Sequence, residues 1–147
     1  MKINKKIIYI ITFLLLFISL GTNKSNAGDL YLNNLDFEVQ INENGSMDVI
    51  ETWDIDVEDT NTLYKTFETD DSKYSKITNV TVKEMTNKQN KDFLKIDEWA
   101  YHVQKDYYYG TENKDGDFEI GWGVGLDNSS AIKKYQISYT IENVISK

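Results

Sequence analysis

Apolar and polar residues alternate strictly in the segment that follows Asn34. The apolar positions are Leu35, Phe37, Val39 and Ile41, and the polar positions between them are Asp36, Glu38 and Gln40. Because successive side chains of a β-strand point to opposite faces, this pattern predicts a strand with one buried face and one wet face. The pair Asn44-Gly45 follows it, and Asn-Gly is favoured in tight hairpin turns. We therefore expect a second strand directly after the turn.

Residues 47–57 supply that second strand, but one residue interrupts its pattern. The apolar face carries Met47, Val49, Trp53, Ile55 and Val57. Glu51 lies on this same face, where an ionised carboxylate must find a partner or take up a proton. We expect Glu51 to pair with a lysine at a sheet edge or an interface. A catalytic carboxylate is the alternative.

The rest of the chain repeats short β-type patterns. The segments concerned are 63–67, 77–84, 99–109, 117–124 and 135–141. Asp115-Gly116 precedes 117–124 and predicts a second hairpin. No stretch after residue 27 shows the period of an amphipathic helix. These patterns predict an all-β fold, an antiparallel two-sheet sandwich of about seven strands that is immunoglobulin-like.

The N-terminus has the pattern of a secretory signal peptide. Lys2, Lys5 and Lys6 precede an apolar run at 7–20, and Ala27 occupies the expected cleavage position. The run is shorter than the roughly 20 residues that a membrane-spanning helix needs. We expect residues 1–27 to be a signal peptide and residues 28–147 to be one β-sandwich domain, with an uncleaved membrane anchor as the alternative.

The composition after residue 27 excludes several classes of partner. That part of the chain contains twelve lysines and 24 acidic residues, which gives a net charge of −12. This charge predicts repulsion of nucleic acid and anionic lipid. The chain has no cysteine, which excludes disulfides and a lipid-modified cysteine. Its Asn-, Lys- and Ile-rich usage is typical of a low-GC bacterium, which is consistent with a Gram-positive source. Together with the predicted signal peptide, this leads us to expect a secreted or extracytoplasmic location in the cell envelope.

Residues that could carry catalysis or bind metal are sparse. His102 is the single histidine, and no Gly-x-Ser-x-Gly motif accompanies it. One histidine without cysteine does not make a zinc site. The turn around Asp115 resembles a calcium loop, but Thr111 and Trp122 fall at its first and last ligand positions. The sequence therefore predicts no catalytic residue, no metal site and no cofactor.

Aromatic residues are concentrated between residues 99 and 122. This set comprises Trp99, Tyr101, Tyr107, Tyr108, Tyr109 and Trp122. Exposed aromatic rings stack on sugars or anchor protein interfaces, whereas buried ones fill cores. We take this segment as the candidate contact surface for a ligand or partner, with core packing as the other use of these rings.

Several short segments resemble one bacterial protein family. They include Val49-Ile50-Glu51-Thr52, Leu63-Tyr64-Lys65, Gly116 to Gly121, and the stretch from Tyr135 to Asn143. In order and spacing they resemble the predicted membrane proteins that carry domain of unknown function 2207. Lys65 stands where that family tends to have arginine.

This resemblance implies a secretion signal, an extracytoplasmic β-rich region and then transmembrane helices, with no established reaction. It also implies that the family's domain continues beyond Lys147, so we expect a shortened, released member or a piece of a longer protein. Membrane attachment would then come only from the continuation or from an uncleaved signal.

The function that we expect is a non-enzymatic extracytoplasmic binding or interaction domain of a cell-envelope protein. Its partner would be an envelope protein. The alternative is a domain that binds or hydrolyses cell-wall glycan, since a pair of carboxylates among the 24 could act on a glycosidic bond.

Overall fold

The computed structural model describes residues 30–68 and 76–144. Within them the chain forms nine β-strands and one short 3₁₀ helix, η1 (Thr86–Lys88). The strands are β1 (Leu30–Ile41), β2 (Met47–Glu58), β3 (Thr62–Phe67), β4 (Lys76–Glu84), β5 (Lys91–Asp92), β6 (Leu94–Lys95), β7 (Tyr107–Glu112), β8 (Phe118–Gly123) and β9 (Ser130–Glu142). The predicted signal peptide, residues 1–27, lies outside the described residues.

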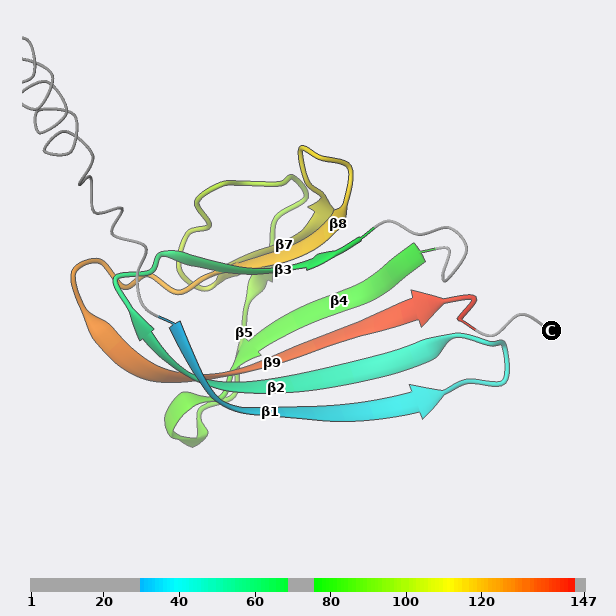
Figure 1. Cartoon of the computed structure of the whole chain (residues 1–147), viewed down its shortest axis with the longest axis horizontal. Coiled ribbons are helices and arrows are strands. Elements are labelled where there is room, and N and C mark those ends of the chain that lie inside the picture. Colours follow the sequence, from blue (N-terminus) through cyan, green and yellow to red (C-terminus); the bar gives the residue numbers. More distant parts are fainter. Residues whose placement is uncertain (1–29, 69–75, 145–147) are drawn as a thin grey trace, which may run out of the picture.

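The strands form two sheets that pack face to face (Figure 1). Sheet A has the order β1-β2-β9-β4-β5, and sheet B has the order β3-β8-β7-β6. All pairs are antiparallel except β6–β7, which is parallel. The prediction of an all-β two-sheet sandwich is confirmed. The strands outnumber the predicted seven because β5 and β6 are two-residue strands that leave no pattern in the sequence.

Both predicted hairpins are present. β1 and β2 pair from Ile41↔Met47 outward, and β7 and β8 pair from Glu112↔Phe118 outward. The predicted extended segment 99–109 is wrong in its first part, because β7 begins only at Tyr107. Residues 96–106 form a loop instead, which hydrogen bonds join to strands of sheet B, such as Val103 N–H to Thr62 Oγ1 of β3 at 2.8 Å.

The core lies between the two sheets. Its fully buried apolar side chains include Ile55, Val57, Ile120, Trp122, Tyr135 and Ile137. Edge-to-face ring contacts tie the layers together, such as Trp53 with Trp122 at 5.6 Å between ring centroids. Trp122 also contacts Tyr135 of β9 at 5.8 Å.

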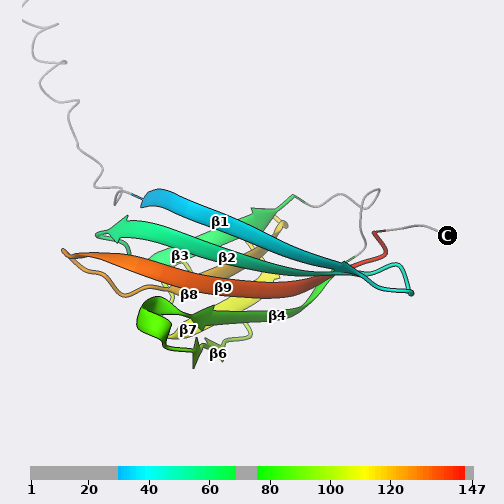
Figure 2. The ribbon, with the colours of Figure 1, turned by 90° about the horizontal axis from the view of Figure 1, so that it is seen from below.

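Sheet B covers only part of sheet A. β1, β2 and β9 have 12 or 13 residues each, whereas β3, β7 and β8 have six. β1 forms one edge of sheet A, where β2 is its only partner among the described strands (Figure 2). The expectation that the apolar face of the first strand is buried is therefore wrong, since no residue of β1 is buried.

Candidate functional site

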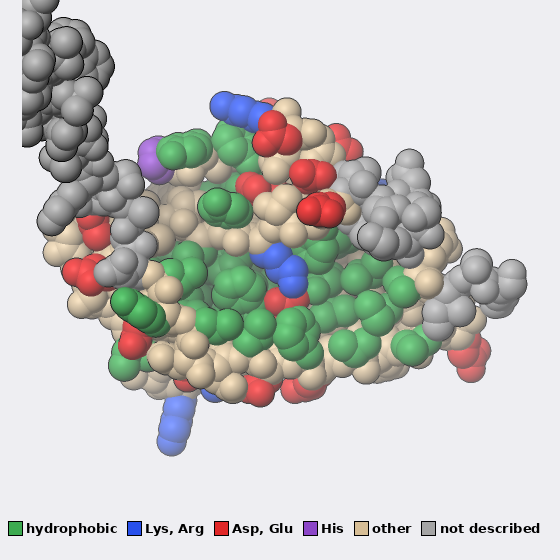
Figure 3. Space-filling model, viewed as in Figure 1, with side chains coloured by type: hydrophobic (Ala, Val, Ile, Leu, Met, Phe, Trp, Pro, Cys, Tyr) green, Lys and Arg blue, Asp and Glu red, His purple; other side chains and the backbone are tan. Residues whose placement is uncertain are grey.

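Most of the exposed large apolar side chains of the described residues belong to β1. Its inner-face side chains, which lie opposite buried or partly buried positions of β2, form what we call the apolar strip: Leu30, Leu32, Leu35, Phe37, Val39 and Ile41. Apart from Leu35, each exposes between 47% and 63% of its surface. Figure 3 shows hydrophobic side chains gathered between β3 and β1 on the viewed face. A contiguous exposed apolar surface of this kind is typical of an interaction site.

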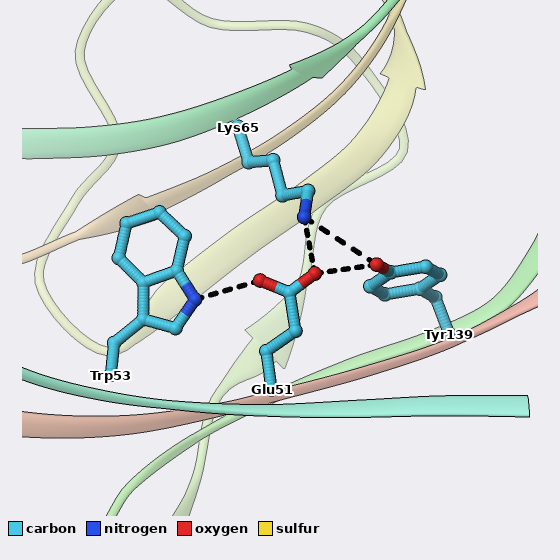
Figure 4. Close-up of polar contacts among 4 residues, drawn as sticks. All are labelled: Glu51, Trp53, Lys65 and Tyr139. Atoms are coloured by element: carbon cyan, nitrogen blue, oxygen red, sulfur yellow. Dashed lines mark hydrogen bonds and ion pairs between the residues drawn. The ribbon is translucent and has the colours of Figure 1, made fainter. Parts of the chain in front are cut away.

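A buried carboxylate lies beside the apolar strip. Glu51 of β2, opposite Phe37, is fully buried. One carboxylate oxygen accepts hydrogen bonds from the ammonium of Lys65 and the hydroxyl of Tyr139, and the other accepts one from the indole N–H of Trp53 at 2.8 Å (Figure 4). The expected lysine partner of Glu51 is thus present. The sheet-edge position is wrong, because β2 pairs on both sides.

These residues, Glu51, Trp53, Lys65 and Tyr139, form what we call the Glu51 cluster, which joins the two sheets. Lys65 comes from β3 of sheet B, while Glu51 and Tyr139 come from sheet A. The Lys65 ammonium also lies over the rings of Phe67 and Phe37, at 5.0 and 5.8 Å from their centroids. Burial and the neighbouring Glu51 raise the pKa of Tyr139 above its ordinary value, so its hydroxyl stays protonated and donates. The acceptors of Glu51 are occupied, which favours a structural role.

A second candidate surface lies on the outer face of sheet B. Here the loop 96–106 and the β7–β8 turn border a groove of about 850 Å³. Tyr64, Trp99, Tyr101 and His102 contribute rings to its lining, together with acidic residues. Tyr101 is 74% exposed, and its ring packs against His102 at 4.7 Å. We call this the Trp99 groove.

Glu119 forms the polar floor of the Trp99 groove. Its carboxylate accepts hydrogen bonds from Tyr109, Trp99, Thr66 and Asn113. Burial alone would raise the pKa of Glu119, but these hydrogen bonds outweigh it and hold the pKa below its ordinary value. Glu119 is therefore an ionised acceptor that fixes Trp99, not a proton donor.

The structure brings together only some of the six aromatic residues selected from the sequence. Trp99, Tyr101 and Tyr109 line the Trp99 groove, although Tyr109 is 1% exposed and contributes mainly its hydroxyl to Glu119. Tyr107 is half-buried at the start of β7.

Tyr108 and Trp122 belong to the core between the sheets, so their selection as contact residues is corrected, as is that of the buried Tyr109. The reason is the strand period. Tyr108 points toward sheet A and donates to the Val80 carbonyl at 2.8 Å, whereas Tyr109 points outward and is covered by the loop that carries Trp99.

Sequence reasoning missed the apolar strip as a candidate surface. The alternation predicts only Leu35, Phe37, Val39 and Ile41 as the apolar face of a strand, and a period of two looks the same whether or not a second layer covers that face. No signal in the alternation itself could have separated these cases.

Comparison with known proteins points to one family. The family model described as the predicted membrane protein (DUF2207) N-terminal domain matches residues 31–147. No curated protein and no solved structure matches the chain. Within residues 30–68 and 76–144, no helix has the length and apolarity required to span a membrane.

Proposed function

The chain belongs to the family of predicted membrane proteins that carry domain of unknown function 2207, and from this premise we propose that it is a non-enzymatic, extracytoplasmic interaction domain of the cell envelope. The N-terminal pattern of lysines, apolar run and Ala27 supports export. The surplus of acidic residues after residue 27 argues against nucleic acid as the partner.

The observation that carries this proposal is the apolar strip of β1. Exposing five large apolar side chains on one strand face costs solubility, and such surfaces persist where a partner covers them. Three donors occupy the carboxylate oxygens of the buried Glu51 beside the strip, which supports binding rather than catalysis as the use of this region.

We predict that a photo-crosslinking amino acid at Val39 captures one recurrent envelope protein in intact cells. Ile132 is the matched control, because it is a β-branched residue on the outer face of β9 and is 67% exposed, against 53% for Val39. A crosslinker at Ile132 is expected to give no such adduct. The adducts would be compared by gel mobility shift and mass spectrometry. Equal capture at both positions, or none at either, would contradict the proposed interaction surface.

The Trp99 groove supports a second candidate function, the binding of cell-wall glycan. Exposed rings beside polar and acidic groups are the usual elements of a sugar site, and Trp99, Tyr101 and Tyr64 border this groove. We predict that Tyr101→Ala lowers co-sedimentation with purified cell walls severalfold without changing the melting temperature, since Tyr101 is mostly exposed. Glycan hydrolysis, as distinct from binding, would be detected as release of reducing sugar from the cell walls. Unchanged sedimentation of the variant would rule out this site.

A further inference from the structure

The edge of sheet A next to the apolar strip is open. Within the described residues, β1 pairs only with β2, so the backbone N–H and C=O groups of every second β1 residue point away from the sheet. A bulge interrupts β1 between Leu32 and Asn34, and the pairing is regular from there to Ile41. The eight residues 34–41 therefore form a regular edge to which another strand can be added.

The inner face of an added strand would meet apolar side chains. Phe37 lies opposite Glu51 and Val39 opposite Val49, so the inner face continues from β2 to β1 and ends at the open edge. Side chains directly opposite on neighbouring strands lie about 5 Å apart. Every second residue of the added strand would thus lie beside Phe37, Val39 or Ile41, and an apolar residue there would shield the strip from water.

The outer face of the same edge is acidic. Asp36 and Glu38 lie between the apolar residues of β1, and in the described part of the chain neither forms an ion pair. Asp48, Asp54 and Asp56 follow on the outer face of β2. A second copy of β1 would bring like charges together across the new pair, which is destabilising. Lysine or arginine at the outer-face positions of the added strand would instead complement the acidic face.

We propose that β1 binds an extended segment of a partner protein, in which apolar residues alternate with lysine or arginine, as an added strand of sheet A. This rests on the proposed function and adds to it the mode of binding and the chemistry of the partner. Two requirements follow. The partner must contribute backbone hydrogen bonds along one edge only, and it must be apolar on one face and basic on the other.

The test uses the full chain, immobilised through a C-terminal tag, and eight-residue peptides in solution. The main probe alternates valine and lysine. A second peptide has the same composition without the alternation, and a third alternates valine and glutamate. Two further peptides carry N-methyl groups on every valine or on every lysine. Because the N–H groups of alternate residues point to opposite edges of a strand, only one of these two can pair with β1 for a given direction of the added strand.

We expect the valine–lysine peptide to bind, and one of the two N-methylated peptides to bind about tenfold or more weaker while the other is unaffected. The peptide without alternation and the acidic peptide should not bind. Val39→Lys and Glu38→Lys should weaken binding by about tenfold, whereas Ile132→Lys and Asp115→Lys, at exposed positions away from this edge, should not.

Other outcomes would overturn the proposal in distinguishable ways. If both N-methylated peptides bind as tightly as the unmethylated one while Val39→Lys abolishes binding, strand addition is wrong but an interaction through the apolar strip stands. If Val39→Lys has no effect on any ligand, the proposed function through this surface fails as well. Binding to neutral lipid vesicles, or self-association in sedimentation, that Val39→Lys removes would assign the strip to a membrane or to a second copy.

Discussion

Replacing Lys65 with methionine is expected to lower the free energy of unfolding by about 3 kcal/mol, a large share of the stability of a domain this size. Methionine keeps most of the apolar stem but leaves the carboxylate of Glu51 fully buried without its counter-charge. We place the effect at the low end of losses seen for broken buried ion pairs because the Lys65 side chain is 23% exposed. Urea denaturation followed by tryptophan fluorescence would measure it.

Two further variants separate charge burial from lost packing. Adding Glu51→Gln to Lys65→Met removes the unpaired charge while retaining a hydrogen-bonding side chain, and should recover about half of the loss. Lys83→Met is the matched control, since its ion pair with Asp92 is exposed at 40% and 78%. That variant should cost less than about 1 kcal/mol. Similar losses for Lys65→Met and Lys83→Met would show that the Glu51 cluster does not hold the sheets together.

The Glu51–Lys65 pair shows which part of a buried contact can be predicted from the sequence and which part cannot. Glu51 stood out because a carboxylate broke an otherwise apolar strand face, and burial physics then required a cationic partner. Which lysine served could not be predicted, because β2 and β3 lie in different sheets and only the packing of the two layers brings them together. The two residues come from separate segments on which the family resemblance depended, 49–52 and 63–65, and the structure joins those segments in one contact.

The strand pattern predicted the hairpins well and the layers poorly. Residues 35–41 and 47–57 were correctly read as paired strands because side-chain alternation is a local property. Whether a second sheet covers β1 depends on how far sheet B extends across sheet A, which no pattern within β1 records. For the same reason, the burial of Tyr109 beneath the loop 96–106 could not be predicted from its own strand.

The second large effect is expected at Trp122, where Trp122→Ala should cost about 3–5 kcal/mol and leave the domain largely unfolded. This side chain is fully buried, and its ring packs edge-on against Trp53 and Tyr135. Truncation would leave a cavity between the sheets, with loss of these ring contacts. Thermal unfolding followed by circular dichroism would show a melting temperature lowered by tens of degrees or no cooperative transition.

Trp122→Phe distinguishes a packing role from a polar one. Within the described residues, the buried indole N–H of Trp122 has no hydrogen-bond acceptor, so phenylalanine removes an unsatisfied donor while keeping most of the apolar ring. We expect it to cost less than about 2 kcal/mol. The contrasting case is Trp99→Phe, which removes the donor to Glu119 at 2.9 Å and leaves that carboxylate with one partner fewer. If Trp122→Ala instead kept its stability and lost partner binding, Trp122 would be a contact residue after all and the packing of the two sheets described above would be wrong.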